Sequence, residues 1–169
     1  MAIYYIGFPV LMIVAVIDAT FMQLFRLWGG APSLMLMVIV SWALVADLED
    51  ALPWAVIGGV MRDLLSITPT GSSAVAFVLI VIAIDRIFPK LNWHNIAIPP
   101  PTVLVASYVY GLMSFGFHRL AGWDVPFLNG LWYIILPGAV MNFAGILIVF
   151  RLIGGINNFL RPQRGSMLR

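Results

Sequence analysis

Four ionisable side chains lie within or at the ends of long apolar stretches of the chain: Asp18, Arg62, Asp63 and His118. A charge in apolar surroundings is costly, so each of these residues is expected to have a partner or a function. Arg62 can pair with Asp18 or with Asp63, because a lone buried guanidinium would be strongly unfavourable. Neighbouring residues on a helix point about 100° apart, so Arg62 and Asp63 cannot both face the same partner.

Two roles stay open for this polar cluster: a structural ion pair that pins helices together, or part of a contact surface for another protein. The structural role is the commoner one for such groups. His118 is expected to be an interfacial histidine rather than a metal ligand, because His94 should lie at the other end of the helices. The cluster predicts neither catalysis nor cofactor binding.

Small and polar residues recur at helical spacing in two other stretches. Such faces let helices approach closely and form hydrogen bonds across the seam, so we expect them to pack inside the protein. The paired glycines Gly58 and Gly59 favour the same interpretation. The two stripes, with steps of three or four residues, are Ser107, Gly111, Ser114 and His118, and Gly138, Asn142 and Gly145.

Recognisable catalytic motifs are missing from the sequence. It has no G-x-S-x-G nucleophile elbow, no H-E-x-x-H pair and no P-loop, and it contains no cysteine. The acidic stretch Asp47, Glu49 and Asp50 lacks the spacing of an EF-hand and is expected to be a solvated turn. We therefore predict a protein that is not an enzyme, without metal or cofactor, and without a nucleic-acid partner.

The composition indicates what holds these residues in place. Of the 169 residues, 62% are hydrophobic and 9% are charged, and the mean hydropathy is +1.03. A soluble domain is about 45–50% apolar and about 25% charged. The chain is therefore predicted to be an all-α integral membrane protein, a single transmembrane domain over residues 1–169, with about six helical spans.

The apolar stretches predict where these spans lie. Pro32 is expected in the first turn of the second span, and Pro137 is expected to kink the last one. The hairpin at residues 32–66 is short for a bilayer, so either the bilayer thins there, or the hairpin is re-entrant, or, as we favour, it crosses fully while neighbouring helices shield it. Residues 66–73 predict a turn with an N-cap for the helix that follows. The predicted spans are residues 3–25, 32–48, 51–66, 74–88, 102–120 and 131–153.

Basic residues are distributed unevenly between the two predicted sides of the membrane. Arg26 and Arg119 fall on one side, and the larger set falls on the side of both termini. By the positive-inside rule, both termini are expected in the cytoplasm. The basic C-terminal tail would also suit anionic lipid head groups. The larger set consists of Arg86, Lys90, Arg151, Arg161, Arg164 and Arg169.

A motif from the second to the fourth predicted span resembles the bacterial rod shape-determining protein MreD family. The family pattern has glycine and proline before an apolar helix, then a glycine-containing helix that ends in Asp-Leu-Leu-Ser, and a Pro/Gly turn. An acid commonly follows the proline in the family, whereas Ser33 stands here, and an apolar residue is common where Arg62 stands. The matching segments are GGAPSL at 29–34, GGVMRDLLS at 58–66 and PTG at 69–71.

The resemblance implies a non-enzymatic scaffold subunit of the cell-elongation machinery in the bacterial cytoplasmic (inner) membrane. Such a subunit would bind MreC and, directly or through it, the glycosyltransferase RodA and a class B penicillin-binding transpeptidase, with MreB filaments beneath. The partner's transmembrane segment would dock on the helices, with the polar cluster setting the register. The family fold looks similar to the substrate-binding subunits of energy-coupling-factor vitamin transporters, and membership of such a transporter is the alternative.

Overall fold

The computed structural model describes residues 2–66, 70–88, 96–122 and 130–160. These ranges hold six α-helices and no β-strand. The bounds are α1 Ala2–Thr20, α2 Leu34–Val45, α3 Leu48–Leu64, α4 Ser72–Ile87, α5 Pro99–Leu120 and α7 Leu136–Leu160, with a 3₁₀ turn η1 at Met22–Phe25 and a π-helical turn η2 at Leu131–Ile135.

The helices follow the predicted order, and several of their ends differ from the prediction. The first span was expected to reach Phe25, but α1 ends at Thr20 and the chain continues as η1. Pro32 is not in the first turn of α2, because the helix begins at Leu34. Ser33 is instead the N-cap, and its Oγ accepts a hydrogen bond from the backbone N–H of Leu36 at 3.2 Å.

The acidic turn predicted between the second and third spans is shorter than expected, since of its three acids only Asp47 lies in it and is exposed. Helix α3 begins at Leu48, so Glu49 and Asp50 belong to its first turn. The backbone N–H groups of Asp50 and Ala51 already bond to the carbonyl of Asp47, at 3.0 and 2.9 Å. Carboxylates are favourable at this position because they face the positive end of the helix dipole. These acids therefore help to start a helix.

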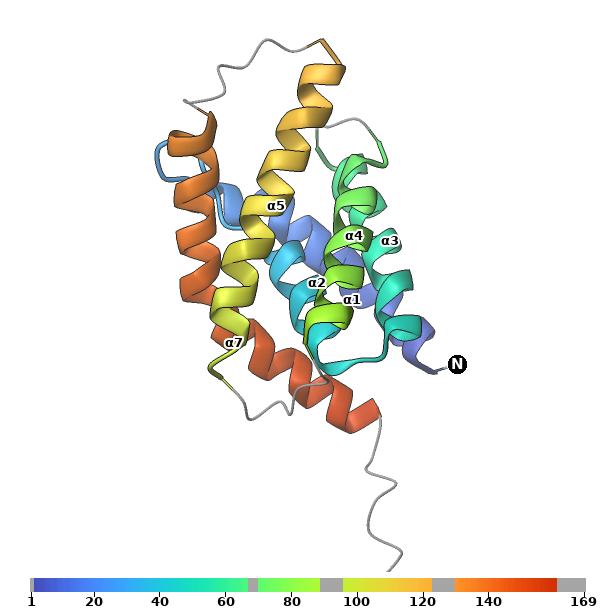
Figure 1. The fold of residues 1–169 in the computed structure, drawn as a ribbon. Helices are drawn as coiled ribbons and strands as arrows, with labels where there is room; N and C mark the ends of the chain where they lie inside the picture. The colour runs from blue at the N-terminus through green and yellow to red at the C-terminus, as the bar shows by residue number, and fades with distance from the viewer. Residues whose placement is uncertain (1, 67–69, 89–95, 123–129, 161–169) are drawn as a thin grey trace, which may run out of the picture.

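Helix α2 is the centre of the bundle (Figure 1). It contacts each of the other α-helices, and every residue from Met35 to Leu44 is buried. A helix that is apolar all round is expected in such a position. The shielding that the sequence predicts for the short hairpin is therefore present around α2.

The last helix contains the irregularity that its proline predicts. Leu131–Ile135 form a π-helical turn, and α7 follows without a break from Leu136. Pro137 cannot donate a backbone hydrogen bond, which favours such a turn just before it. Figure 1 shows that the helix also changes direction further along α7.

One continuous helix in the described part of the chain, Leu131–Ile156, is long and apolar enough to cross a membrane. The stretches Gly7–Thr20 and Leu34–Val45 are apolar but shorter. Large apolar side chains also cover the outside of the bundle, for example Val105 on α5 and Ile148 on α7, which are 60% and 69% exposed. Such a surface is expected of a protein surrounded by lipid.

Candidate polar site at one end of the helix bundle

One end of the bundle gathers most of the buried polar groups, and we call it the polar end. It lies where α1, α3 and α5 end and where α2, α4 and α7 begin, so six termini supply backbone groups there. In Figure 1 the end of α5 and the junction of α3 with α4 lie together at the top of the bundle. Helix ends leave unpaired N–H and C=O groups, which explains why polar side chains collect around them.

Arg62, near the end of α3, contacts three other helices. Its Nε lies 3.7 Å from Oδ2 of Asp18 on α1. Its Nη1 donates a 2.6 Å hydrogen bond to Oγ of Ser33 at the start of α2. The guanidinium carbon also lies 4.6 Å from the ring centre of Tyr110 on α5, a cation–π contact. Of the two partners that the sequence leaves open, Asp18 is therefore the one that Arg62 pairs with.

Asp18 also supports the start of α2. Its Oδ1 accepts a hydrogen bond from the backbone N–H of Met35 at 3.3 Å, and its side chain is 6% exposed. A carboxylate at a helix N-terminus satisfies an unpaired donor and faces the positive end of the dipole. The same side chain thus balances Arg62 and caps α2.

Asp63 faces a different helix. Its Oδ2 accepts hydrogen bonds from the backbone N–H groups of Gly71 at 2.7 Å and Ser73 at 3.0 Å, at the start of α4. The N-cap residue of α4 is Gly71, with φ of +97°, so the cap comes from α3 and not from a serine of the turn. Asp63 is 2% exposed, and its role here is to join α3 to α4.

The glycine pair on α3 permits this close junction. A side chain at Gly59 would overlap the backbone of Ala74 on α4, and one at Gly58 would lie 3.0 Å from the sulfur of Met35. Both glycines therefore pack inside the protein, as the sequence predicts. Close backbone approach brings the Asp63 carboxylate within reach of the α4 N-terminus.

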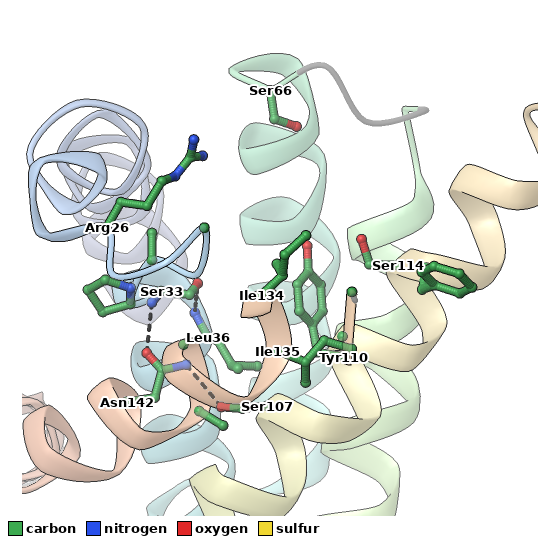
Figure 2. Close-up of a pocket in the computed structure, with 18 of the residues that line it drawn as sticks. Arg26, Ser33, Leu36, Ser66, Ser107, Tyr110, Ser114, Ile134, Ile135 and Asn142 are labelled. Carbon is green, nitrogen blue, oxygen red and sulfur yellow. Dashed lines mark hydrogen bonds between the residues drawn. The ribbon is translucent and has the colours of Figure 1, made fainter. Parts of the chain in front are cut away.

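A hydrogen-bonded chain crosses from α2 to α5 through α7. The backbone N–H of Ser33 donates to Oδ1 of Asn142 at 2.7 Å, and Nδ2 of Asn142 donates to Oγ of Ser107 at 2.9 Å. Figure 2 shows this chain below the cavity described next. Members of both predicted stripes, Ser107 and Asn142, thus meet at one internal seam. Gly111 lies on the same side of α5, where a side chain would meet Ile135 at 2.8 Å.

A cavity of about 590 Å³ opens above this seam. Its polar lining includes Arg26, Arg62, Tyr110, Ser114 and His118. Figure 2 shows Arg26 and Ser114 on opposite sides of this space. A second cavity of about 270 Å³ lies beside it, and both Asp18 and Arg62 line that one.

His118 lies in the wall of the larger cavity. Its Nδ1 is 2.7 Å from the carbonyl oxygen of Ser114, one turn earlier on α5. The structure therefore places all of the predicted site residues at the polar end, where His118 and Arg62 line the same cavity. Within the described ranges, no three His, Asp or Glu side chains come together to hold a metal ion.

Sequence reasoning missed Ser33, Tyr110 and Ser73 as members of the site. Tyr110 stacks on Arg62, and its hydroxyl shares a 2.9 Å hydrogen bond with Ser73 Oγ. One signal was available: Tyr110 lies three residues after Ser107, on the same face of a helix. No pattern in the sequence predicts that Ser33 would accept a bond from Arg62.

The predicted topology depends partly on residues outside the described ranges, namely Lys90, Arg161, Arg164 and Arg169. His94 also lies outside them. Arg26 and Arg119 are exposed at the polar end, while Arg86 and Arg151 are exposed on α4 and α7. With Arg62, three described arginines lie at the polar end, while Arg86 is near the end of α4 and Arg151 lies within α7, so the topology stays a prediction.

Comparison of the sequence with models of known protein families shows which family the chain belongs to. The family model for rod shape-determining protein MreD matches residues 2–155. The chain belongs to the MreD family. Membership implies a membrane protein that helps to determine rod shape, from a family of structural rather than enzymatic proteins. No curated protein and no solved structure matches the chain, so the likeness to vitamin-transporter subunits stays a prediction.

Proposed function

We propose that this MreD family member is a non-enzymatic scaffold of the bacterial elongation machinery and that it binds MreC. Through MreC or directly, it would hold RodA and a class B penicillin-binding transpeptidase, with MreB filaments on the cytoplasmic side. The observation that carries this proposal is the family match over residues 2–155. It favours elongation over the vitamin-transporter alternative.

In this proposal all six helices cross the cytoplasmic membrane, and both termini are cytoplasmic. The short α2 would be tolerated because protein surrounds it on every side, so none of its length needs to match the lipid. Successive helices would then cross the membrane in opposite directions. Because α1 would start in the cytoplasm, the polar end, where α1 ends, would lie at the outer leaflet. Arg26 and Arg119 would lie at that leaflet, and Arg86 and Arg151 at the cytoplasmic one.

We place the transmembrane segment of MreC on the lipid-facing side of α5, formed by Val105, Val109, Leu112 and Gly116. These residues are exposed and follow one another by steps of four, three and four. Gly116 has open space beside it, and a small residue in an apolar face lets a second helix approach closely. The exposed side of α7, in contrast, includes the charged Arg151.

The polar cluster takes the structural role in this proposal. Asp18 and Asp63 are buried and bond to backbone N–H groups of the same chain, so neither carboxylate is available to a partner helix. The cluster would set the register of α1, α2, α3 and α4, and only indirectly the shape of the surface that MreC meets.

Mass spectrometry of proteins that co-purify with the tagged chain from gently solubilised native membranes tests this function. Recovery of MreC above the level in an untagged control is the expected result. Recovery of paired ATPases with a membrane coupling subunit, and no MreC, would instead identify a transporter component. Absence of both sets from membranes in which the tagged chain is folded would contradict both proposals.

A further inference from the structure

The larger cavity at the polar end has the chemistry of an anion site. Arg26 and Arg62 line it, and none of the described residues in its wall is an aspartate or a glutamate. The nearby carboxylate, Asp18, lines the smaller cavity, whose wall also includes Arg26 and Arg62. The larger cavity therefore meets two guanidinium groups and no carboxylate among the described residues of its own wall, although Asp18 balances part of the charge of Arg62 from outside it.

Both guanidinium groups keep hydrogen-bond donors for a ligand. Arg62 uses Nε toward Asp18 and Nη1 toward Ser33, and among the described residues Nη2 has no hydrogen-bond partner. Arg26 uses one of its five donors, Nη2, which bonds to the side-chain oxygen of Gln23 at 3.0 Å. An arginine fork binds phosphate oxygens well because its geometry matches theirs.

The rest of the wall suits an amphiphilic ligand. Hydroxyl groups of Ser66, Ser107 and Ser114 lie among apolar side chains such as Leu36 and Ile135. A volume of about 590 Å³ falls within the usual range of ligand pockets, roughly 300–1,000 Å³. A head group with the first part of an apolar chain fits this mixture better than a fully hydrated ion.

The rim indicates where the ligand comes from. In the segment after α1, Gln23, Arg26 and Gly29 line the cavity, and of these only Gln23 belongs to the 3₁₀ turn η1. The residues between them point outward and are apolar, with Leu24 77% and Trp28 84% exposed. The full set of exposed large apolar residues in this segment is Phe21, Leu24, Phe25, Leu27 and Trp28.

Aromatic residues of η2, which packs against Gly29 of this segment, indicate the same depth in the membrane. Trp132 and Tyr133 of η2 are 58% and 55% exposed, and tryptophan and tyrosine gather where lipid head groups meet the acyl chains. A cavity with such a rim opens among lipid head groups. Its nearest abundant anion is a lipid phosphate.

We propose that this cavity binds one anionic phospholipid, with its phosphate between Arg26 and Arg62. The acyl chains leave past the apolar rim into the bilayer. The site is independent of MreC binding, since the lipid-facing side of α5 does not line the cavity. The bound lipid then adds to the links between the segment after α1 and helices α3 and α5.

Native mass spectrometry of the full chain in non-ionic micelles tests the site, with phosphatidylglycerol and phosphatidylcholine of the same acyl chains as probes. We expect the first phosphatidylglycerol to bind at least tenfold more tightly than phosphatidylcholine. Arg26→Gln should remove most of this preference. Arg26 is exposed, and changes at such positions leave stability within about 0.5 kcal/mol.

Two further variants separate a built site from general surface charge. Ser114→Leu fills the cavity without changing charge and should weaken phosphatidylglycerol binding about tenfold. Arg119, near the end of α5, is also an exposed arginine, but it does not line the cavity. Arg119→Gln should therefore leave the preference for phosphatidylglycerol unchanged. Equal losses in Arg26→Gln and Arg119→Gln, or equal affinity for the two lipids, would overturn the proposal.

Competition with inorganic phosphate distinguishes a lipid site from a site for a soluble phosphate compound. We expect millimolar phosphate to leave the bound phosphatidylglycerol in place, because the apolar part of the cavity adds to the affinity. Binding of phosphate to the wild type as tightly as the lipid, with loss in Arg26→Gln, would identify a site for a soluble phosphate compound and overturn the lipid assignment.

Discussion

The two ends of the bundle are held together by different means. At the end where α2 meets α3, the rings of Trp42 and Trp54 stack with centres 4.3 Å apart and planes 11° apart. Both are buried, and the indole N–H of Trp42 donates to the carbonyl of Asp50 at 3.4 Å. At the polar end, carboxylates and a guanidinium join helices that leave a cavity between them.

This difference indicates that the packed end contributes most to stability and that the polar end is available for binding. Close packing of large rings leaves no room for a ligand, and removing one creates a void. The polar end keeps open space because hydrogen bonds, rather than volume, fix the helix termini there. We therefore expect the stacked tryptophans to dominate the free energy of unfolding and the polar end to carry the interactions.

Trp54→Ala tests the packed end and should have the largest effect on stability. The ring lies against Trp42 and also against Gly7 of α1, where a side chain would come within 2.9 Å of it. Loss of such a buried ring costs about 3–5 kcal/mol. Reversible unfolding of the purified protein in mixed micelles measures the change.

Trp132→Ala is the matched control, since Trp132 is 58% exposed and its removal should change the free energy of unfolding by less than about 0.5 kcal/mol. Similar losses for the two tryptophans would remove the distinction between the packed end and the polar end.

Arg62→Met should have the next largest effect, about 1–3 kcal/mol, because it leaves the buried Asp18 carboxylate without its charged partner. The double variant Asp18→Leu/Arg62→Met should recover part of this loss, since a buried pair replaced by apolar groups costs less than a broken one. It should not recover all of it, because Asp18 also accepts from the N–H of Met35. A double variant less stable than both single variants would show that the pair does not act as a unit.

The burial of α2 could be predicted from the sequence, whereas the stacking of Trp42 on Trp54 could not. An apolar run without periodicity predicts a buried helix, and α2 is buried from Met35 to Leu44. Helix ends were less predictable, because the acidic residues before Ala51 suit both a solvated turn and the first turn of a helix. In the structure Glu49 and Asp50 belong to the helix.

The polar end could be predicted only as a set of residues. Burial cost singled out Asp18, Arg62 and Asp63, and the 100° step predicted that Arg62 and Asp63 face different partners. Which partners they meet depends on how helices from distant parts of the chain cross. The role of Ser33, which is 29 residues from Arg62 along the chain, therefore needed the three-dimensional structure.

Asp63→Asn should have a smaller effect, about 1 kcal/mol, because one oxygen remains to accept from the α4 N-terminus while the charge is lost. Glu49→Gln is the comparison on the same helix, since Glu49 is exposed and the substitution removes only its interaction with the helix dipole, which should cost about 0.3–0.5 kcal/mol. Hydrogen exchange at the first turn of α4 provides a second readout. Unchanged exchange there in Asp63→Asn would contradict the capping role.

Gly116→Leu should leave the free energy of unfolding nearly unchanged and should still lower the amount of MreC that co-purifies. Apart from the neighbouring backbone of α5, no described atom of the chain lies within 4 Å of a Cβ added at Gly116, so the new side chain does not disturb the fold. It would instead prevent a helix of another protein from approaching α5 closely. Gly155→Leu is closely matched, because Gly155 is also an exposed helical glycine with open space around it, and it should leave MreC recovery unchanged. Equal recovery from both variants at equal levels of folded protein would move the docking surface away from α5. Loss in Gly116→Leu alone would place a partner-binding surface beside the polar end, on a helix whose opposite face lines the cavity.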